Sequence, residues 1–370
     1  MNINNFFKGK AFDQPLKVVK PSSVTSPEPS RKPSNNFSFL VFACVTAAIL
    51  GAVGTLDWLI DPLWYGGANR LTGKNFPFNE RISKTNLFLN TDVKDYDCLI
   101  LGSSRVTALN SSEFKEHKCF NYSFKGGWAN DFINVAEFVK KQGFNPKIIY
   151  VGVDEFNFVK QQDVAGKAED FGSYATQSPY HAYLSSNVLM FSVMTLAGSS
   201  PDPFNYYNEN FEAVEFPEHP EYEAAFYPAE PPQECDLSRV ERYQKIKEIF
   251  PDARIVGYVP PRSSWALVNE TYNRNLMDCA LEGFYQVSQI YDDMYDFSVP
   301  SDITLDPGNT YDGSHFTPQA NAKVAAVLEG RDTGLALHVD ELNLNTYKET
   351  FKSELKEFLE KEGQESLWRG

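Results

Sequence analysis

Two short motifs, far apart in the chain, carry the residue types that serine-based acyl transfer requires. The first is GSSR, whose second serine is Ser104, and the second is DGSH, which begins at Asp312 and ends at His315. A serine nucleophile needs a base that takes its proton, and the base needs a carboxylate that orients it. Asp312 and His315 are three residues apart, so one tight loop can bring them into hydrogen-bond contact. We therefore predict Ser104 as nucleophile, His315 as base and Asp312 as orienting carboxylate.

Each motif also has an ordinary structural interpretation. The serines of GSSR could cap a helix, and DxxH could be a turn and capping motif. The position of Ser104 favours the functional interpretation, because GSSR closes the apolar segment at residues 98–102, which is typical of a buried strand. Ligands bind at the carboxyl ends of strands in open parallel sheets. In the turn after such a strand, the Ser104 amide could also stabilise an oxyanion.

The segments around these motifs alternate between short apolar runs and helical patterns, which is typical of an α/β fold with a parallel sheet covered by helices. We expect strands at residues 98–102, 119–124, 148–153, 255–259 and 294–297, and helices at residues 131–141, 237–249, 271–290 and 318–328. Residues 156–235 break the pattern and predict an insertion, either a lid or binding surface or a poorly ordered segment. Residues 336–370 predict an amphipathic helix packed on the domain at residues 61–335.

The start of the chain predicts a membrane anchor. Residues 37–56 carry no charge and, at about 1.5 Å per helical residue, can cross the ~30 Å core of a bilayer, so we expect one transmembrane helix at residues 37–60. A signal peptide would have a shorter apolar region near the terminus. Residues 1–36 predict a disordered tail with six basic and two acidic side chains, which favours a cytoplasmic tail and an exported domain.

Charge and cysteine content limit the classes of partner and ligand. The formal net charge is −15 although the tail is basic, so the rest of the chain is strongly acidic, which argues against nucleic acid. In an oxidising compartment Cys98 could pair with Cys119, or Cys235 with Cys279, but four cysteines allow three connectivities and buried free thiols are the alternative. No CxxC spacing suggests a metal site.

The order of the motifs resembles that of the SGNH (GDSL-like) hydrolase superfamily, in the branch whose nucleophile block reads Gly-Ser-Ser. The resemblance covers about residues 97–328, with GSS near the start and DGSH near the end. It implies a flavodoxin-like three-layer sandwich with a central parallel sheet, and the same roles for Ser104, His315 and Asp312. The family's second block places Gly126 in the oxyanion hole, beside the Ser104 amide, with Gly127 as the alternative donor and a substrate contact.

The third block of the family, Gly-x-Asn-Asp, is where this sequence departs. It reads GVDE here and places Asp154 at the position of the oxyanion-hole asparagine. An ionised carboxylate would oppose a developing oxyanion, so we expect Asp154 to be protonated, turned away, or neutralised by Arg105 or Lys125. Arg105 is also a candidate substrate contact, and Asn157 is another candidate donor. The Asn-Asp pair at residues 130–131 is better explained as a helix N-cap.

The segment YVPPR at residues 258–262 is similar to a feature of membrane-anchored proteins of envelope polysaccharide acetylation and teichoic-acid D-alanylation. This resemblance implies O-acyl (acetyl) transfer or ester hydrolysis on an envelope polysaccharide, or with an acylated carrier, outside the cytoplasmic membrane. It also implies a membrane-bound O-acyltransferase as partner, and the chemistry needs no cofactor. The alternative is a non-catalytic glycan-binding or scaffold protein. The insertion's Tyr206, Tyr207, Tyr222 and Tyr227 could stack on sugar rings or pack structurally.

Overall fold

The computed structural model describes residues 35–160, 170–176, 178–200, 204–215, 219, 221–228, 230–331 and 334–369. Residues 49–370 belong to one compact unit, and the described residues 35–48 belong to a separate one. Because the described residues begin at residue 35, most of the predicted disordered tail at residues 1–36 lies outside them. Helix α1, Asn35–Ile60, contains the one helical segment in the described part of the chain that is long and apolar enough to cross a membrane.

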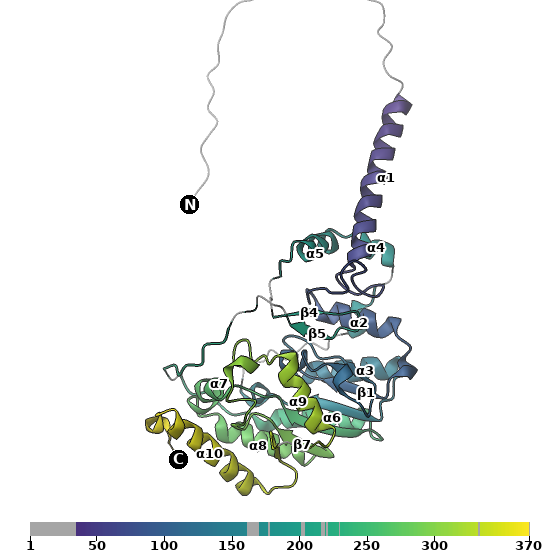
Figure 1. Cartoon of the computed structure of the whole chain (residues 1–370). Helices are drawn as coiled ribbons and strands as arrows, with labels where there is room; N and C mark the ends of the chain where they lie inside the picture. The colour runs from purple at the N-terminus through teal and green to yellow at the C-terminus, as the bar shows by residue number, and fades with distance from the viewer. Residues whose placement is uncertain are drawn as a thin grey trace, which may run out of the picture. The chain divides into compact units, whose positions relative to one another are not determined.

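The centre of the larger unit is a six-stranded sheet with the strand order β2-β1-β3-β6-β7-β8 (Figure 1). Neighbours pair in parallel except β7 and β8, which are antiparallel. The strand bounds are Cys98–Leu101 (β1), Cys119–Asn121 (β2), Ile148–Gly152 (β3), Arg254–Val259 (β6), Asp293–Asp296 (β7) and Leu337–His338 (β8). The predicted α/β class with a mostly parallel sheet is therefore confirmed, and β8 is an addition to the five expected strands.

Of the remaining helices, α2 precedes β1 and the others lie between and after the strands. Their bounds are Glu80–Asn90 (α2), Ala129–Lys141 (α3), Pro179–Tyr183 (α4), Ser186–Leu196 (α5), Glu241–Ile249 (α6), Ser264–Leu267 (α7), Met277–Ser288 (α8), Pro318–Leu328 (α9) and Leu344–Lys361 (α10). Helix α9 has the predicted bounds. Helix α8 begins six residues later than predicted, because Asn275 adopts a left-handed φ of +59° that interrupts the helical pattern.

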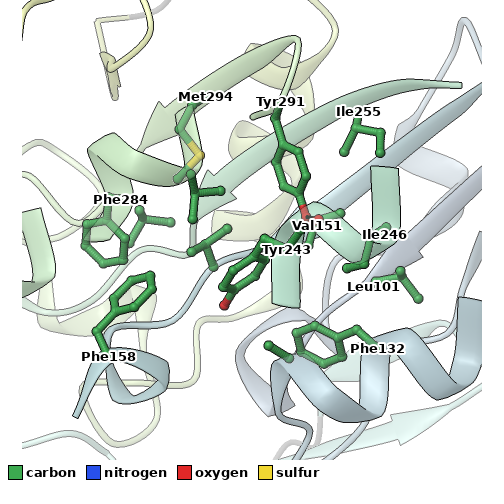
Figure 2. Close-up of a cluster of buried hydrophobic side chains, with 14 of the residues drawn as sticks. Leu101, Phe132, Val151, Phe158, Tyr243, Ile246, Ile255, Phe284, Tyr291 and Met294 are labelled. Carbon is green, nitrogen blue, oxygen red and sulfur yellow. Dashed lines mark hydrogen bonds between the residues drawn. The ribbon is translucent and has the colours of Figure 1, made fainter. Parts of the chain in front are cut away.

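The pleat of the strands divides the core between the two faces of the sheet. Leu101, Val151 and Ile255 of β1, β3 and β6 share one cluster with side chains of α3, α6, α8 and α10, including Phe132 and Ile246 (Figure 2). Their strand neighbours, which point the opposite way, share a second cluster with α9. Strands β1, β3 and β6 are buried on both faces, which explains why these three are continuous apolar runs in the sequence.

The C-terminal helix belongs to this core. Tyr347, Phe351, Leu355 and Phe358, the apolar stripe expected from the sequence, are all buried on α10. The insertion, by contrast, contains elements that the sequence did not predict. These include α4, α5 and a short antiparallel hairpin formed by β4 (Asn205–Tyr207) and β5 (Ala213–Glu215).

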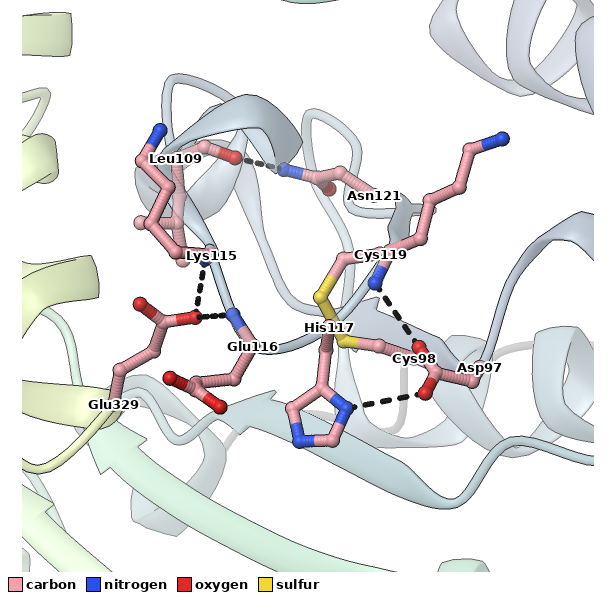
Figure 3. The surroundings of a disulfide bond; sticks show 10 residues. Asp97, Cys98, Leu109, Lys115, Glu116, His117, Cys119, Asn121 and Glu329 are labelled. Atoms are coloured by element: carbon pink, nitrogen blue, oxygen red, sulfur yellow. Dashed lines mark hydrogen bonds and ion pairs between the residues drawn. A yellow bond between two sulfur atoms is a disulfide. The ribbon is translucent and has the colours of Figure 1, made fainter.

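Two disulfides cross-link the larger unit. Cys98 and Cys119 join β1 to β2, and Cys235 and Cys279 join the end of the insertion to α8, which are the two pairs considered from the sequence. Figure 3 shows the first disulfide beside a polar loop, where Asp97 accepts hydrogen bonds from the Lys118 backbone at 3.0 Å and contacts His117 Nδ1 at 3.3 Å. Cys44, on α1, is free.

Candidate active site

The nucleophile motif forms a sharp turn at the carboxyl end of β1. Gly102 leaves no room for a side chain, because a Cβ there would lie 2.4 Å from Val106 Cγ2. A short 3₁₀ turn covers Ser104–Val106, and Ser103 Oγ caps it by accepting a hydrogen bond from the Arg105 amide at 3.3 Å. The capping and nucleophile interpretations of GSSR therefore apply to different serines, since Ser103 caps the turn and Ser104 does not.

The structure brings the two sequence motifs together, although they are 211 positions apart. His315 Nε2 lies 2.8 Å from Ser104 Oγ, and His315 Nδ1 lies 2.6 Å from Asp312 Oδ2. Asp312 Oδ1 accepts hydrogen bonds from the backbone amides of Ser314 and His315, at 2.9 and 2.8 Å. The left-handed φ of +88° at Gly313 lets the loop fold back in this way. This is the geometry of a nucleophile, base and orienting carboxylate.

The charge of Asp312 suits that arrangement. Burial alone would raise the pKa of this carboxyl group, but its hydrogen bond and charge interaction with His315 lower the pKa below its usual range. Asp312 is therefore ionised at neutral pH. An ionised carboxylate on Nδ1 keeps the Nδ1–H tautomer, which leaves Nε2 of His315 able to accept the proton of Ser104.

The predicted donor amides of Ser104 and Gly126 have no hydrogen-bond acceptor in the described part of the chain. Gly126 is exposed and adopts a left-handed φ of +65°. The amide of Gly127 instead donates to the Phe124 carbonyl at 3.2 Å, so of the two glycines only Gly126 has an amide free for a ligand. Ser104 and Gly126 are thus the candidate oxyanion donors.

Asp154 and Arg105 occupy a buried ion-pair cluster rather than the pocket. Asp154 has no exposed surface, and its Oδ1 accepts a hydrogen bond from Arg105 Nη1 at 3.1 Å. Arg105 also donates two hydrogen bonds to Glu155, at 2.6 and 3.0 Å. Arg262, from the segment after β6, donates to the same Glu155 at 2.6 Å. Glu155 thus links the loops that follow β1, β3 and β6.

The charges of this cluster are set by burial and by the two arginines. Burial raises the pKa of Asp154, and Arg105 opposes it. Burial would also raise the pKa of Glu155, but Arg105 and Arg262 together lower that pKa to about 2. Glu155 is therefore the firmly ionised carboxylate of the cluster, and its two hydrogen-bonded guanidinium groups depend on it.

These contacts bear on two expectations about the site. The Asp154 carboxylate faces Arg105, which is one of the alternatives considered from the sequence. Arg105, a candidate substrate contact, does not line the Ser104 pocket, because Asp154 and Glu155 hold its guanidinium. Asn157 is buried between the Ala129 amide and the Asp154 carbonyl, so it does not donate into the pocket either.

The Asn-Asp pair before the first crossover helix has a structural role. Helix α3 begins at Ala129, so the pair lies in its first turn and not before it. Asp131 accepts a hydrogen bond from the Trp128 amide at 2.9 Å. The aspartate therefore caps the helix from its third position, close to the predicted N-cap.

A small pocket with a volume of about 20 Å³ lies beside the nucleophile. Its lining residues are Pro77, Ser104, Thr107, Ala108, Lys125, Phe204, Asn205, Tyr207, His315 and Phe316. Burial lowers the pKa of Lys125, although Glu80 opposes it. Phe204 stacks on Tyr311 with ring centroids 5.0 Å apart and lies 5.7 Å from the His315 ring. The insertion therefore supplies one wall of the pocket, which fits one of the two alternatives considered from the sequence.

Of the four insertion tyrosines that could stack on sugar rings, three have structural contacts. Tyr206 stacks on Phe76 at 4.6 Å, Tyr207 is buried, and the Tyr222 hydroxyl lies 3.2 Å from Ser263 Oγ. Only Tyr227 among them is largely exposed, at 59%. Within the described residues, no group of three or more His, Cys, Asp or Glu side chains could hold a metal ion.

No protein-family model and no curated protein matches the sequence of this chain.

Proposed function

We propose that this protein is a serine-dependent acyl-transfer enzyme, an O-acyltransferase or an acyl esterase. The observation that carries the proposal is the hydrogen-bonded series Ser104–His315–Asp312, with distances of 2.8 and 2.6 Å, beside a small pocket. The Ser104 and Gly126 amides, which follow the carboxyl ends of β1 and β2, add candidate donors for such a reaction. A turn or capping role for these motifs would not require a serine hydroxyl on the histidine.

In the proposed reaction, Ser104 Oγ attacks the acyl carbonyl carbon while His315 Nε2 takes the hydroxyl proton. Asp312 stabilises the imidazolium through Nδ1–H. The Ser104 and Gly126 amides hold the oxyanion of the tetrahedral intermediate. The intermediate expels the alcohol of the donor, which takes the proton from His315. A sugar hydroxyl or water then attacks the acyl-enzyme, with His315 again as base, and Ser104 regains its proton.

We further propose that the chain is an SGNH-type protein of the cell envelope. The strand order β2-β1-β3-β6-β7 is that of a flavodoxin-like sandwich, and the order of the motifs along the chain supports the same superfamily. The apolar helix α1 and two disulfides support a membrane-anchored domain in an oxidising compartment. The proposed substrates are an envelope polysaccharide and an acylated carrier, with a membrane-bound O-acyltransferase as partner.

Labelling with a serine-directed fluorophosphonate tests the chemistry on the full chain. We expect labelling of Ser104, and we expect Ser104→Ala and His315→Ala to abolish it. On a small acyl ester, these two substitutions and Asp312→Ala should each reduce kcat/KM by about 10⁴-fold or more, with no further loss in combination. Ser103→Ala is the matched control, because Ser103 caps the turn and has no contact with the histidine.

An unlabelled Ser104 in a folded protein, together with unchanged ester turnover in Ser104→Ala, would refute the proposed enzyme. It would favour the non-catalytic glycan-binding or scaffold protein. Complete loss of activity in Ser103→Ala with full activity in Ser104→Ala would instead shift the nucleophile by one residue.

A further inference from the structure

The insertion contains a long segment without charge. Residues 171–201 include no Asp, Glu, Lys or Arg, although 22% of the chain is charged. This segment is longer than the uncharged run that includes the proposed membrane span, at residues 33–56. Helices α4 and α5 lie within it, and no other run without Asp, Glu, Lys or Arg in the sequence is as long. An uncharged segment of this length on an acidic domain is typical of a surface that contacts an apolar partner.

Helices α4 and α5 expose large apolar side chains. Outside α1, eight large hydrophobic residues are exposed in the described part of the chain, and five of them come from these two helices and the residue that follows α4. They are Tyr180, Leu184, Met190, Val193 and Leu196, with exposed fractions from 47% to 81%. We call this set the apolar face. Isolated exposed hydrophobic residues are normal in proteins, but a cluster of this kind marks an interaction surface.

The opposite side of α5 anchors it to the domain. Phe191 stacks on Phe78 with ring centroids 4.5 Å apart and an interplanar angle of 10°, and Val188 and Ser192 are buried. Helix α5 is therefore held in a fixed orientation, with one side packed and the other exposed. The packed side therefore keeps the exposed apolar side chains of α5 pointing away from the domain.

The apolar face lies beside the end of the proposed membrane span. A Cβ on Gly54 of α1 would lie 3.4 Å from Leu184 Cδ2, so α4 is in contact with this part of the helix. About 20 helical residues cross a bilayer core, so a span that begins at Phe37 leaves the core near Leu56. Trp58 follows and is 47% exposed, which suits the level of the lipid headgroups.

We propose that the apolar face lies in the headgroup region of the bilayer that α1 crosses, so that the domain contacts lipid as well as being tethered to it. The partner is the lipid surface itself. The absence of charge means that apolar burial, and not attraction to anionic lipid, holds the face in place. Because α1 keeps the domain at the membrane, even a weakly binding face would be occupied. The proposal rests on the membrane span of α1 and not on the proposed acyl-transfer chemistry.

This contact has a consequence for the candidate active site. Pro77, which lines the Ser104 pocket, precedes Phe78, which stacks on α5. Phe204 and Asn205 line the same pocket and follow α5 closely in the chain. The pocket would therefore be held near the membrane surface, where it could accept an acyl donor that stays in the bilayer.

Depth-dependent quenching on the full chain in phosphatidylcholine vesicles tests the proposal. A nitrobenzoxadiazole probe is attached to Met190→Cys or Val193→Cys in a Cys44→Ala background, and acyl-chain-brominated lipid is added to the vesicles. We expect both probes to lose most of their fluorescence. A probe on Ser353→Cys, on an exposed position of α10, is the matched control and should keep its fluorescence.

A probe on the native Cys44 of the unmodified chain tests the membrane span of α1 separately from the lipid contact of the apolar face. Quenching at Cys44 without quenching at Met190→Cys and Val193→Cys would overturn the proposal while leaving the membrane span intact. No quenching at Cys44 would overturn both the span and the proposal. Spontaneous disulfide formation between copies carrying Val193→Cys, with no lipid quenching, would show that a second copy of the chain covers the face, which also overturns it.

Discussion

Glu155→Gln is the substitution for which the structure predicts the largest effect outside the catalytic series. Glu155 accepts hydrogen bonds from Arg105 and Arg262, and all three side chains are at least 87% buried. Glutamine keeps the shape of the side chain but removes its charge. Two guanidinium groups inside the protein would then lose the carboxylate that they share, which is far more costly than losing an exposed ion pair.

The size of the effect follows from the pKa of Glu155. Its two arginine partners lower the pKa from the usual 4.5 to about 2. At about 1.4 kcal/mol per pKa unit, this corresponds to roughly 3 kcal/mol of stability at neutral pH. Removing one partner of a buried ion pair typically costs about 3 to 5 kcal/mol, which is the same range. We expect Glu155→Gln to lower the free energy of unfolding by about 3 kcal/mol.

The pH dependence provides a second test of the same reasoning. Because the folded pKa of Glu155 lies below the unfolded pKa, its stabilising effect is fully present above pH 4.5. The effect is lost as the pH falls through about 2. Urea denaturation of wild type and Glu155→Gln, measured between pH 7 and pH 2.5, should therefore give two curves that converge in acid. Comparing the two proteins cancels the titration of all other groups.

Glu270→Gln is the matched control, because Glu270 pairs with the same Arg262 but its side chain is 49% exposed. An exposed pair of this kind contributes about 1 kcal/mol or less. The reasoning is refuted if Glu155→Gln unfolds within ~0.5 kcal/mol of wild type at pH 7, or if the difference between them does not shrink below pH 4.5. Since Arg105 follows the nucleophile directly, we also expect Glu155→Gln to lose acyl-transfer activity by about 10-fold or more.

Two other substitutions test the nucleophile turn and the role of Asp154. Gly152→Ala should cost about 1 to 3 kcal/mol of stability, because a Cβ there would lie 2.7 Å from Val106 Cγ2. Val106→Ala should recover part of that loss, and strictly additive losses in a double-mutant cycle would contradict the clash. Asp154→Asn should change stability by less than ~1 kcal/mol, because asparagine can still accept the Arg105 hydrogen bond. It should not accelerate ester turnover, and a faster enzyme would place Asp154 at the oxyanion.

The fold was predictable where the sequence pattern is long or strongly apolar. Strands β1 and β3 are fully buried and β6 is buried after its first residue, so each is an apolar run, and α9 has a proline at its start that fixes its first residue. The two-residue strand β8 and the three-residue strands β4 and β5 were not predicted. Runs this short are too brief for a period of two to be recognised, and their pairing depends on partners elsewhere in the fold.

The candidate site also contains residues that the sequence predicts and residues that it does not. Ser104, Asp312 and His315 could be predicted because each lies in a compact motif with its own local geometry. The insertion wall of the pocket could not, because Phe204 reaches His315 only through tertiary packing. The Glu155 cluster does have a sequence signal, because charged residues follow both β3 and β6. These two strands are neighbours in the sheet, so their following loops meet at one edge.

The buried cluster also explains how an aspartate can occupy position 154. Arg105 and Arg262 carry two positive charges, and Glu155 and Glu270 already supply two negative ones. Asp154 is a third carboxylate, which fits the raised pKa that its burial causes and an Oδ2 atom without a hydrogen-bond partner among the described residues. The aspartate therefore alters the surroundings of Arg105 and does not contact Ser104, Asp312 or His315. In the proposed reaction the oxyanion is held by the backbone amides of Ser104 and Gly126, which no side-chain substitution at position 154 removes, so an aspartate there is compatible with activity.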